Sequence, residues 1–223
     1  MDFTIYFSIA GATLVWLLMK YRYDSIAIFI IFIFYEGFFE YFGKGIENSY
    51  KMFMALFSWH LLNRFQLTKV FDRNNFSLRI SFLLFSLSFF ISASINSDPL
   101  TMVLSQYLSK YLLAFIAFFL FEELYLYYPK RMIKLNHLIY LLIIVQVGLS
   151  IIKFNLFGFY EGLVGTLSSK GGSLATTFPV FAVILLYFYK NLKFKKSDWL
   201  LLFGVFFIGF SSMKRAIWFI MPV

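Results

Sequence analysis

The residues of this sequence best suited to chemistry are two adjacent cations near its end, Lys214 and Arg215, within the apolar stretch Phe210–Val223. Arginine offers a rigid fork of donors that matches phosphate oxygens, and lysine adds a point charge. At a membrane boundary such a pair can hold a lipid-linked phosphate or pyrophosphate. The alternative is that both side chains reach lipid headgroups without binding a ligand.

A glycine-containing segment, Lys153–Phe178, supplies the next candidates. Glu161 and Lys170 are its central charges, and the backbone amides of Gly171 and Gly172 precede an apolar stretch. Amides at a helix start can receive an anion. The segment lacks the spacing of a Walker motif, so an ordinary polar turn is the alternative interpretation.

Two carboxylates, Glu36 and Glu40, stand four residues apart and therefore share one face of a helix. One interpretation pairs them with Lys44 or Lys51. The other places one of them toward a cavity that holds Arg215, where it acts as a base, a counter-ion or a substrate contact.

Several kinds of site are absent from the sequence. The chain has no cysteine, which excludes disulfides and thiolate metal sites. His60 and His137 fit no metal-binding spacing, and the sequence contains neither a G-x-S-x-G nor an H-E-x-x-H motif. We therefore expect no metal and no other cofactor.

The elements that must position these residues are transmembrane helices. The chain of 223 residues is 61% hydrophobic and only 14% charged, whereas soluble domains are about one quarter charged. Its apolar blocks match the length that crosses a bilayer. The prediction is an all-α, polytopic transmembrane helical bundle that forms one domain, 1–223. Its eight spans are Phe3–Met19, Ile26–Phe42, Tyr50–Leu62, Ile80–Ile95, Leu100–Phe121, Ile133–Ile152, Ser173–Tyr189 and Trp199–Met213. A ninth span begins at Ala216. The third span has an interfacial helix as its alternative.

Basic residues alternate between the loops of this topology. Thirteen of the 20 fall in every second loop: Lys20, Arg22, Arg64, Lys69, Arg73, Arg79, Lys130, Arg131, Lys134, Lys190, Lys193, Lys195 and Lys196. The positive-inside tendency makes that side cytoplasmic and the amino terminus external. The net charge of +9 thus reports orientation, and we expect membrane lipids rather than nucleic acid as partners.

The end of the chain resembles bacterial Wzy-type O-antigen polymerases and O-antigen ligases. The segment Gly165–Phe178, "GTLSSKGGSLATTF", leads into a span, and a basic loop, another span and "SSMKRAIW", Ser211–Trp218, follow. Arg215 matches one arginine position of that family, with Met213–Lys214 inserted after the serines, and Lys170 occupies the neighbourhood of another.

The resemblance implies a glycosyltransferase of the bacterial inner membrane, independent of metal and nucleotide. It would polymerise or ligate glycans from an undecaprenyl-pyrophosphate carrier at the periplasmic face, in O-antigen or capsular polysaccharide synthesis. Arg215, with Lys214, would hold the pyrophosphate, and Glu161, Glu36 or a later residue would act as base. Because that family has further spans, the resemblance also implies that this chain is an amino-terminal fragment, inactive alone.

Two other functions remain open. Cations that face a cavity would equally serve a flippase or transporter of lipid-linked oligosaccharides, although the sequence shows no internal repeat of the kind transporters carry. A scaffold that binds other polysaccharide-assembly proteins, without chemistry of its own, is the third alternative.

Overall fold

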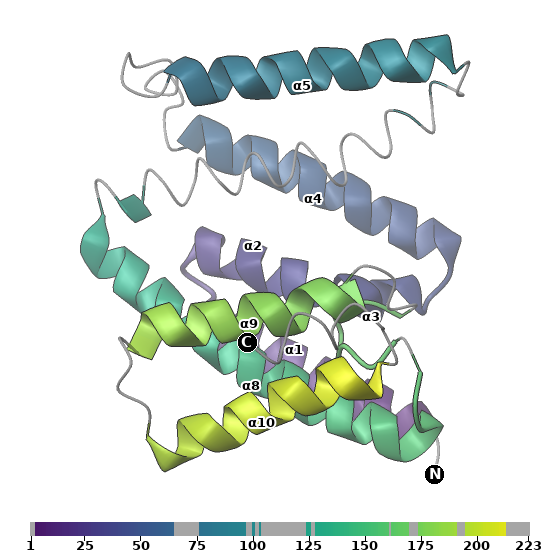
Figure 1. Ribbon diagram of the computed structural model, residues 1–223, viewed down its shortest axis with the longest axis vertical. Coiled ribbons are helices and arrows are strands. Elements are labelled where there is room, and N and C mark those ends of the chain that lie inside the picture. Colours follow the sequence, from purple (N-terminus) through teal and green to yellow (C-terminus); the bar gives the residue numbers. More distant parts are fainter. Residues whose placement is uncertain are drawn as a thin grey trace. The chain divides into compact units, whose positions relative to one another are not determined.

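The computed structural model describes residues 3–64, 76–96, 100, 103, 124–125, 128–160, 162–169, 174–190 and 195–212. These residues form eight helices and no strand (Figure 1). The helices are α1 Phe3–Lys20, α2 Ser25–Phe34, α3 Glu36–Glu40, α4 Lys44–Arg64, α5 Phe76–Ile95, α8 Pro129–Phe157, α9 Leu174–Lys190 and α10 Lys196–Ser211. The all-α prediction is thereby confirmed for the described part of the chain.

The chain divides into two compact units. The first consists of Met1–Tyr50 and Ile133–Val223, and the second of Lys51–Met132. In the second unit, α5 exposes the large apolar side chains Leu83, Leu84 and Leu87. The first unit contains every described candidate residue and is the subject of the sections below.

Helix α8 is long and apolar enough to cross a membrane, and it is the one helix of the described residues that meets both criteria. It contains the predicted sixth span, Ile133–Ile152, and continues one turn farther, to Phe157. Four shorter apolar helical segments accompany it in the described part: Thr4–Lys20, Ser25–Phe34, Leu83–Ile95 and Thr177–Leu186.

Most of the other predicted spans coincide with helices to within a turn or two. The first, fourth, seventh and eighth correspond to α1, α5, α9 and α10. The third lies inside α4, which begins six residues earlier, at Lys44. The fifth, Leu100–Phe121, falls almost wholly outside the described residues.

The second predicted span, Ile26–Phe42, is not one continuous helix, which corrects the sequence prediction. Asp24 caps α2 by accepting hydrogen bonds from the amides of Ile26 and Ala27 at 3.1 and 3.3 Å. The helix then stops at Phe34, because Tyr35 has a φ of −109° and a ψ of 14°, outside helical geometry. A five-residue helix, α3, follows immediately.

Helices α8 and α10 of the first unit run parallel and pack closely. Gly204 leaves room for Val147, since a Cβ at that glycine would collide with the valine side chain. Farther along both helices the rings of Phe154 and Phe207 meet edge to face, with centroids 4.9 Å apart. The ends of α8 and α10 therefore lie at the same end of the unit, which we call the loop end.

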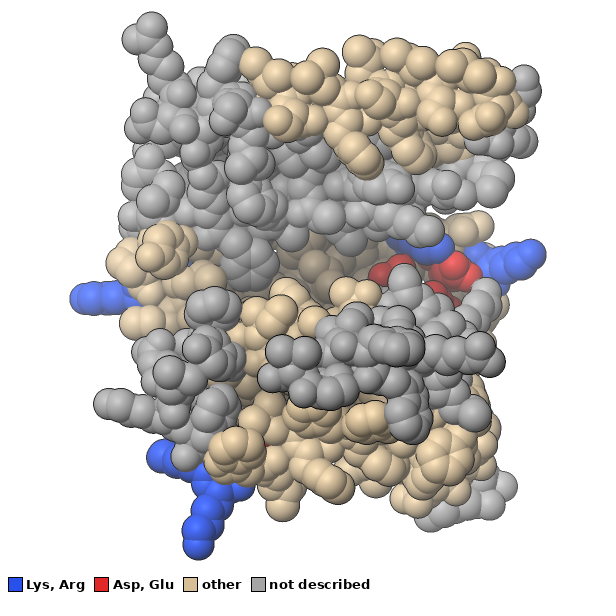
Figure 2. All heavy atoms as spheres, in the orientation of Figure 1, with Lys and Arg blue, Asp and Glu red and all other residues tan. Residues whose placement is uncertain are grey.

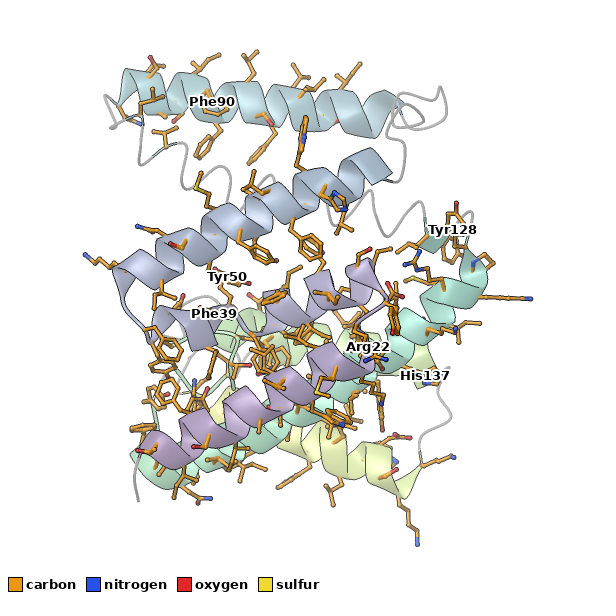
Figure 3. The ribbon with its side chains drawn as sticks, turned by 180° about the vertical axis from the view of Figure 1, so that it is seen from behind. Arg22, Phe39, Tyr50, Phe90, Tyr128 and His137 are labelled. Carbon is orange, nitrogen blue, oxygen red and sulfur yellow. The ribbon has the colours of Figure 1, made fainter. Side chains whose placement is uncertain are left out.

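The opposite end of the first unit is basic. Helix α1 is antiparallel to α8. Tyr6, near the start of α1, bonds the segment that follows α8, so the end of α1 lies toward the opposite end of α8. Figure 3 shows Arg22 and His137 together there, far from Phe39 and Tyr50. Five described cations of the first unit belong to this end: Lys20, Arg22, Lys134, Lys195 and Lys196.

The first unit has a mainly apolar core that also buries several polar side chains, and several of its large apolar side chains are exposed. On α10, Trp199, Leu200 and Phe203 are 63%, 77% and 73% exposed. The buried polar residues of the unit are Gln146, Ser150, Lys153, Thr166, Ser168, Asp198, Ser211 and Ser212. In Figure 2 the described residues other than Lys, Arg, Asp and Glu, drawn in tan, form several areas of this face. This distribution suits helices whose outer faces contact lipid.

Candidate functional site

The segment Gly158–Ser169 connects the end of α8 to the approach of α9 and folds back onto the first unit. We call it the inserted loop. Its turns use Gly158 and Gly165, whose φ values of 69° and 60° lie in the left-handed region that favours glycine. Seven of its described residues are buried: Gly162, Leu163, Val164, Gly165, Thr166, Leu167 and Ser168.

Lys153, near the end of α8, connects the middle of the inserted loop to its last residues. Its side chain has no exposed surface. The Nζ donates hydrogen bonds to the backbone oxygens of Gly162 at 2.9 Å and Ser168 at 3.2 Å. The rings of Tyr6 and Tyr41 lie 5.2 and 5.3 Å from the same nitrogen, within the range of a cation–π contact.

Gln146, two turns earlier on α8, connects the loop to the break between α2 and α3. Its Oε1 accepts a hydrogen bond from the Thr166 amide at 2.7 Å, and its Nε2 donates to Thr166 Oγ1 at 2.8 Å and to the Phe34 oxygen at 3.3 Å. Thr166 Oγ1 also donates to the Phe34 oxygen at 2.9 Å. The carbonyl that the helix break releases is thus satisfied by side chains, which is how irregular backbone is tolerated away from water.

Helix α3 touches the inserted loop backbone to backbone. The Phe38 amide donates to the Thr166 oxygen at 3.2 Å. Gly37 faces the backbone of Ser168 so closely that a Cβ would collide with it. At the end of α3, Glu40 Oε2 accepts two hydrogen bonds from Ser169, one from its amide at 2.8 Å and one from its hydroxyl at 2.6 Å.

Three tyrosines surround this region. The Tyr6 hydroxyl donates to the Gly165 oxygen at 2.9 Å, which ties α1 to the loop. Tyr160 in the loop is hydrogen bonded to Tyr41, the residue that follows α3. Burial raises the pKa of Tyr160, and its bond to Tyr41 opposes that rise only in part. The Tyr160 hydroxyl is therefore protonated at neutral pH and available as a donor.

The structure brings Glu40 into this cluster and places Glu36 at the other end of the same short helix. The bonds from Glu40 run to Ser169 rather than to the lysines considered from the sequence. The remaining sequence candidates, Glu161, Lys170, Gly171, Gly172, Lys214 and Arg215, lie outside the described residues. Ser211 and Ser212, which precede the cation pair, are buried at the loop end of α10.

Sequence reasoning missed the buried polar residues of α8 and assigned Lys153 to a loop. Their spacing could have identified them. Gln146, Ser150 and Lys153 follow one another at intervals of four and three residues within an apolar stretch, so they share one helical face. Such a stripe in a membrane helix points inward. Among these three, Ser150 Oγ has no hydrogen-bond partner in the described part of the chain.

The arrangement gives the loop end a fixed carboxylate and a rigid loop next to the end of α10. No group of three His, Asp or Glu side chains within the described residues is arranged to hold a metal ion. Among the described residues, this end offers a carboxylate, tyrosine and serine hydroxyls, the Lys153 amine and backbone groups.

Replacing Gly37 by Ala should loosen the contact between α3 and the inserted loop. The added Cβ meets the Ser168 backbone, which cannot rotate away, so a loss of about 1–3 kcal/mol in the free energy of unfolding is expected. Thermal unfolding in detergent would measure it. Gly45→Ala is the matched control, because a Cβ at that position on α4 meets nothing within 4 Å. Equal melting temperatures for the two variants would contradict the contact.

Comparison with protein-family models, with characterised proteins and with solved structures found no match to this chain.

Proposed function

We propose that the chain is a multi-pass protein of the bacterial inner membrane. Three observations support the proposal: α8 is long enough to span, shorter apolar helices accompany it, and the first unit exposes several large apolar side chains while burying some polar ones. The basic end of that unit would face the cytoplasm, since Lys and Arg accumulate on that side. The loop end, with Glu40, would then face the periplasm.

We further propose that the protein transfers glycans from an undecaprenyl-pyrophosphate carrier, as a polymerase or ligase in O-antigen or capsular polysaccharide synthesis. The observation that carries this proposal is a convergence at one end of the unit. The inserted loop and the Glu40 carboxylate lie at the same end of the unit as the end of α10, and Lys214 and Arg215 follow α10 in sequence. A fixed carboxylate and a cation pair are the two charges that glycosyl transfer from a lipid pyrophosphate needs.

In this mechanism Arg215 and Lys214 stabilise the charge of the departing pyrophosphate. The glycan's anomeric carbon exchanges its bond to the pyrophosphate oxygen for a bond to an acceptor hydroxyl. A carboxylate takes the hydroxyl proton. The leaving group brings its own activation, so the reaction needs no nucleotide. Other polysaccharide-assembly proteins would supply the carrier and remove the product.

Arg215→Ala in the intact protein is expected to abolish glycan extension while leaving the amount of protein in the membrane unchanged. Arg215→Lys should restore little, because lysine lacks the bidentate fork. Glycan chain length on gels, from cells that carry only the variant, measures the effect. Arg22→Ala, at the basic end, is the control and should extend glycans normally. Wild-type chains from Arg215→Ala would refute the assignment.

The break between α2 and α3 favours a second candidate, transport of lipid-linked oligosaccharides. Interrupted helices with freed backbone groups are common at the binding sites of transporters. Purified protein in liposomes separates the two functions. A transferase joins glycan from a lipid-linked donor to an acceptor and releases undecaprenyl pyrophosphate, whereas a flippase moves the intact donor between leaflets and releases none.

A further inference from the structure

We propose that Glu40 is the residue that takes the proton from the acceptor hydroxyl. The assignment rests on the proposed glycosyl transfer and deepens it, because it selects one carboxylate among Glu36, Glu40 and Glu161. Glu40 ends α3, is partly buried, and lies at the loop end of the first unit.

The two carboxylate oxygens of Glu40 have different roles. Oε2 accepts both hydrogen bonds from Ser169, at 2.8 and 2.6 Å, and these bonds fix the plane of the carboxylate. Within the described part of the chain, Oε1 accepts no hydrogen bond. One oxygen is therefore anchored, and the other keeps its lone pairs for an incoming proton.

The group that anchors Glu40 is itself held in place. Ser169 follows Ser168, whose oxygen accepts from Lys153 Nζ at 3.2 Å and whose backbone packs on Gly37. The Phe38 amide bonds the same loop at Thr166. Because α3 and the inserted loop are also joined at Gly37 and Phe38, just before Glu40, its carboxylate is preorganised, which is what proton transfer requires of a base.

The buried Lys153 side chain interacts electrostatically with Glu40, while its hydrogen bonds go to the oxygens of Gly162 and Ser168. Within the described part of the chain, Lys153 therefore donates no hydrogen bond to Glu40 Oε1.

The proposed step balances as follows. The acceptor O–H bond breaks, and its proton goes to Glu40 Oε1. The acceptor oxygen forms a bond to the anomeric carbon of the donor glycan, and the bond from that carbon to the pyrophosphate breaks. The electron pair leaves with undecaprenyl pyrophosphate, and Glu40 returns its proton to water before the next cycle.

Glu40→Gln tests the assignment, because glutamine keeps the size and the acceptor oxygen that Ser169 uses but is not a base. In the intact protein in nanodiscs, with lipid-linked glycan extracted from the host membrane, we expect the release of undecaprenyl pyrophosphate to slow by about 10²–10⁴-fold. Binding of added undecaprenyl pyrophosphate should be unchanged. Glu47→Gln, in the first turn of α4, is the matched control and should retain the wild-type rate.

Two further variants separate chemistry from structure. Glu40→Ala should regain activity when formate is added, since a small carboxylate can occupy the vacated space; a purely structural defect would not respond. Ser169→Ala retains the amide bond and should slow release less than Glu40→Gln does.

The outcomes distinguish the two levels of proposal. Wild-type protein that neither binds undecaprenyl pyrophosphate nor releases it from the donor overturns the function and the assignment together. Active wild-type protein with an equally active Glu40→Gln variant overturns only the role of Glu40. A slow Glu40→Gln variant with normal binding, and formate rescue of Glu40→Ala, supports both.

Discussion

Lys153→Met is expected to lower the free energy of unfolding by roughly 3 kcal/mol, because two loop carbonyls lose their donor. Methionine spares the cost of burying an ammonium and fills much of the same space. The oxygens of Gly162 and Ser168 nevertheless remain where Lys153 bonded them, and a buried acceptor without a donor costs about 1–3 kcal/mol. The cation–π contacts with Tyr6 and Tyr41 disappear as well.

The loss should be largest in the inserted loop. Chymotrypsin cleaves after aromatic residues, and the loop carries Phe159 and Tyr160. Lys153→Met should therefore expose new cleavage sites there, at a temperature where the wild type resists. Lys134→Met is the matched control: it lies on the same helix, is exposed, and should change neither the melting temperature nor the cleavage pattern. If both variants resisted cleavage equally, Lys153 would not hold the loop.

Gln146→Leu is expected to destabilise the protein by roughly 2–3 kcal/mol. Leucine is close to glutamine in size, so little space opens. The substitution deprives the Thr166 amide of its acceptor and removes one of the two side-chain donors to the Phe34 oxygen. A buried donor left without an acceptor accounts for about 1–3 kcal/mol of that loss.

Ser150→Ala is the control for this change, since it removes a buried polar group from the same helical face. The Ser150 hydroxyl has no partner among the described residues, so its removal should be neutral or slightly stabilising. Melting temperatures of the two variants, measured in the same detergent, test whether the hydrogen bonds of Gln146 stabilise the protein. A drop in Ser150→Ala as large as that in Gln146→Leu would refute the network.

The sequence predicted the helices far better than their interior contacts. The apolar runs of the sequence located α1 and α8, because such runs can be read along the chain residue by residue. The break at Tyr35 was missed, because the predicted span was continued through Glu36 and Gly37, where no proline marks an end. The Phe34 oxygen at the break accepts from Thr166, 132 residues away in sequence.

In the candidate site, too, the sequence indicated a residue but not its contacts. Glu40 could be singled out as a carboxylate at a helix end, but its partner Ser169 lies 129 residues farther along the chain. Lys153 was assigned to a loop because a charge directly after an apolar run usually marks the membrane boundary. Its true position depends on acceptors that become available only when the loop folds back, which spacing along a single chain does not reveal.

The carbonyl released at Phe34 has a consequence for biogenesis. In the proposed membrane insertion, α2 and α3 are synthesised more than one hundred residues before Gln146 and Thr166, so these two partners of the Phe34 oxygen arrive late. Helices α2 and α3 can reach their final arrangement only after α8 and the inserted loop have packed against them. Substitutions at Thr166 should therefore leave translocation of the first helices intact and stall the protein as a late, incompletely assembled intermediate, the kind that membrane quality-control proteases remove.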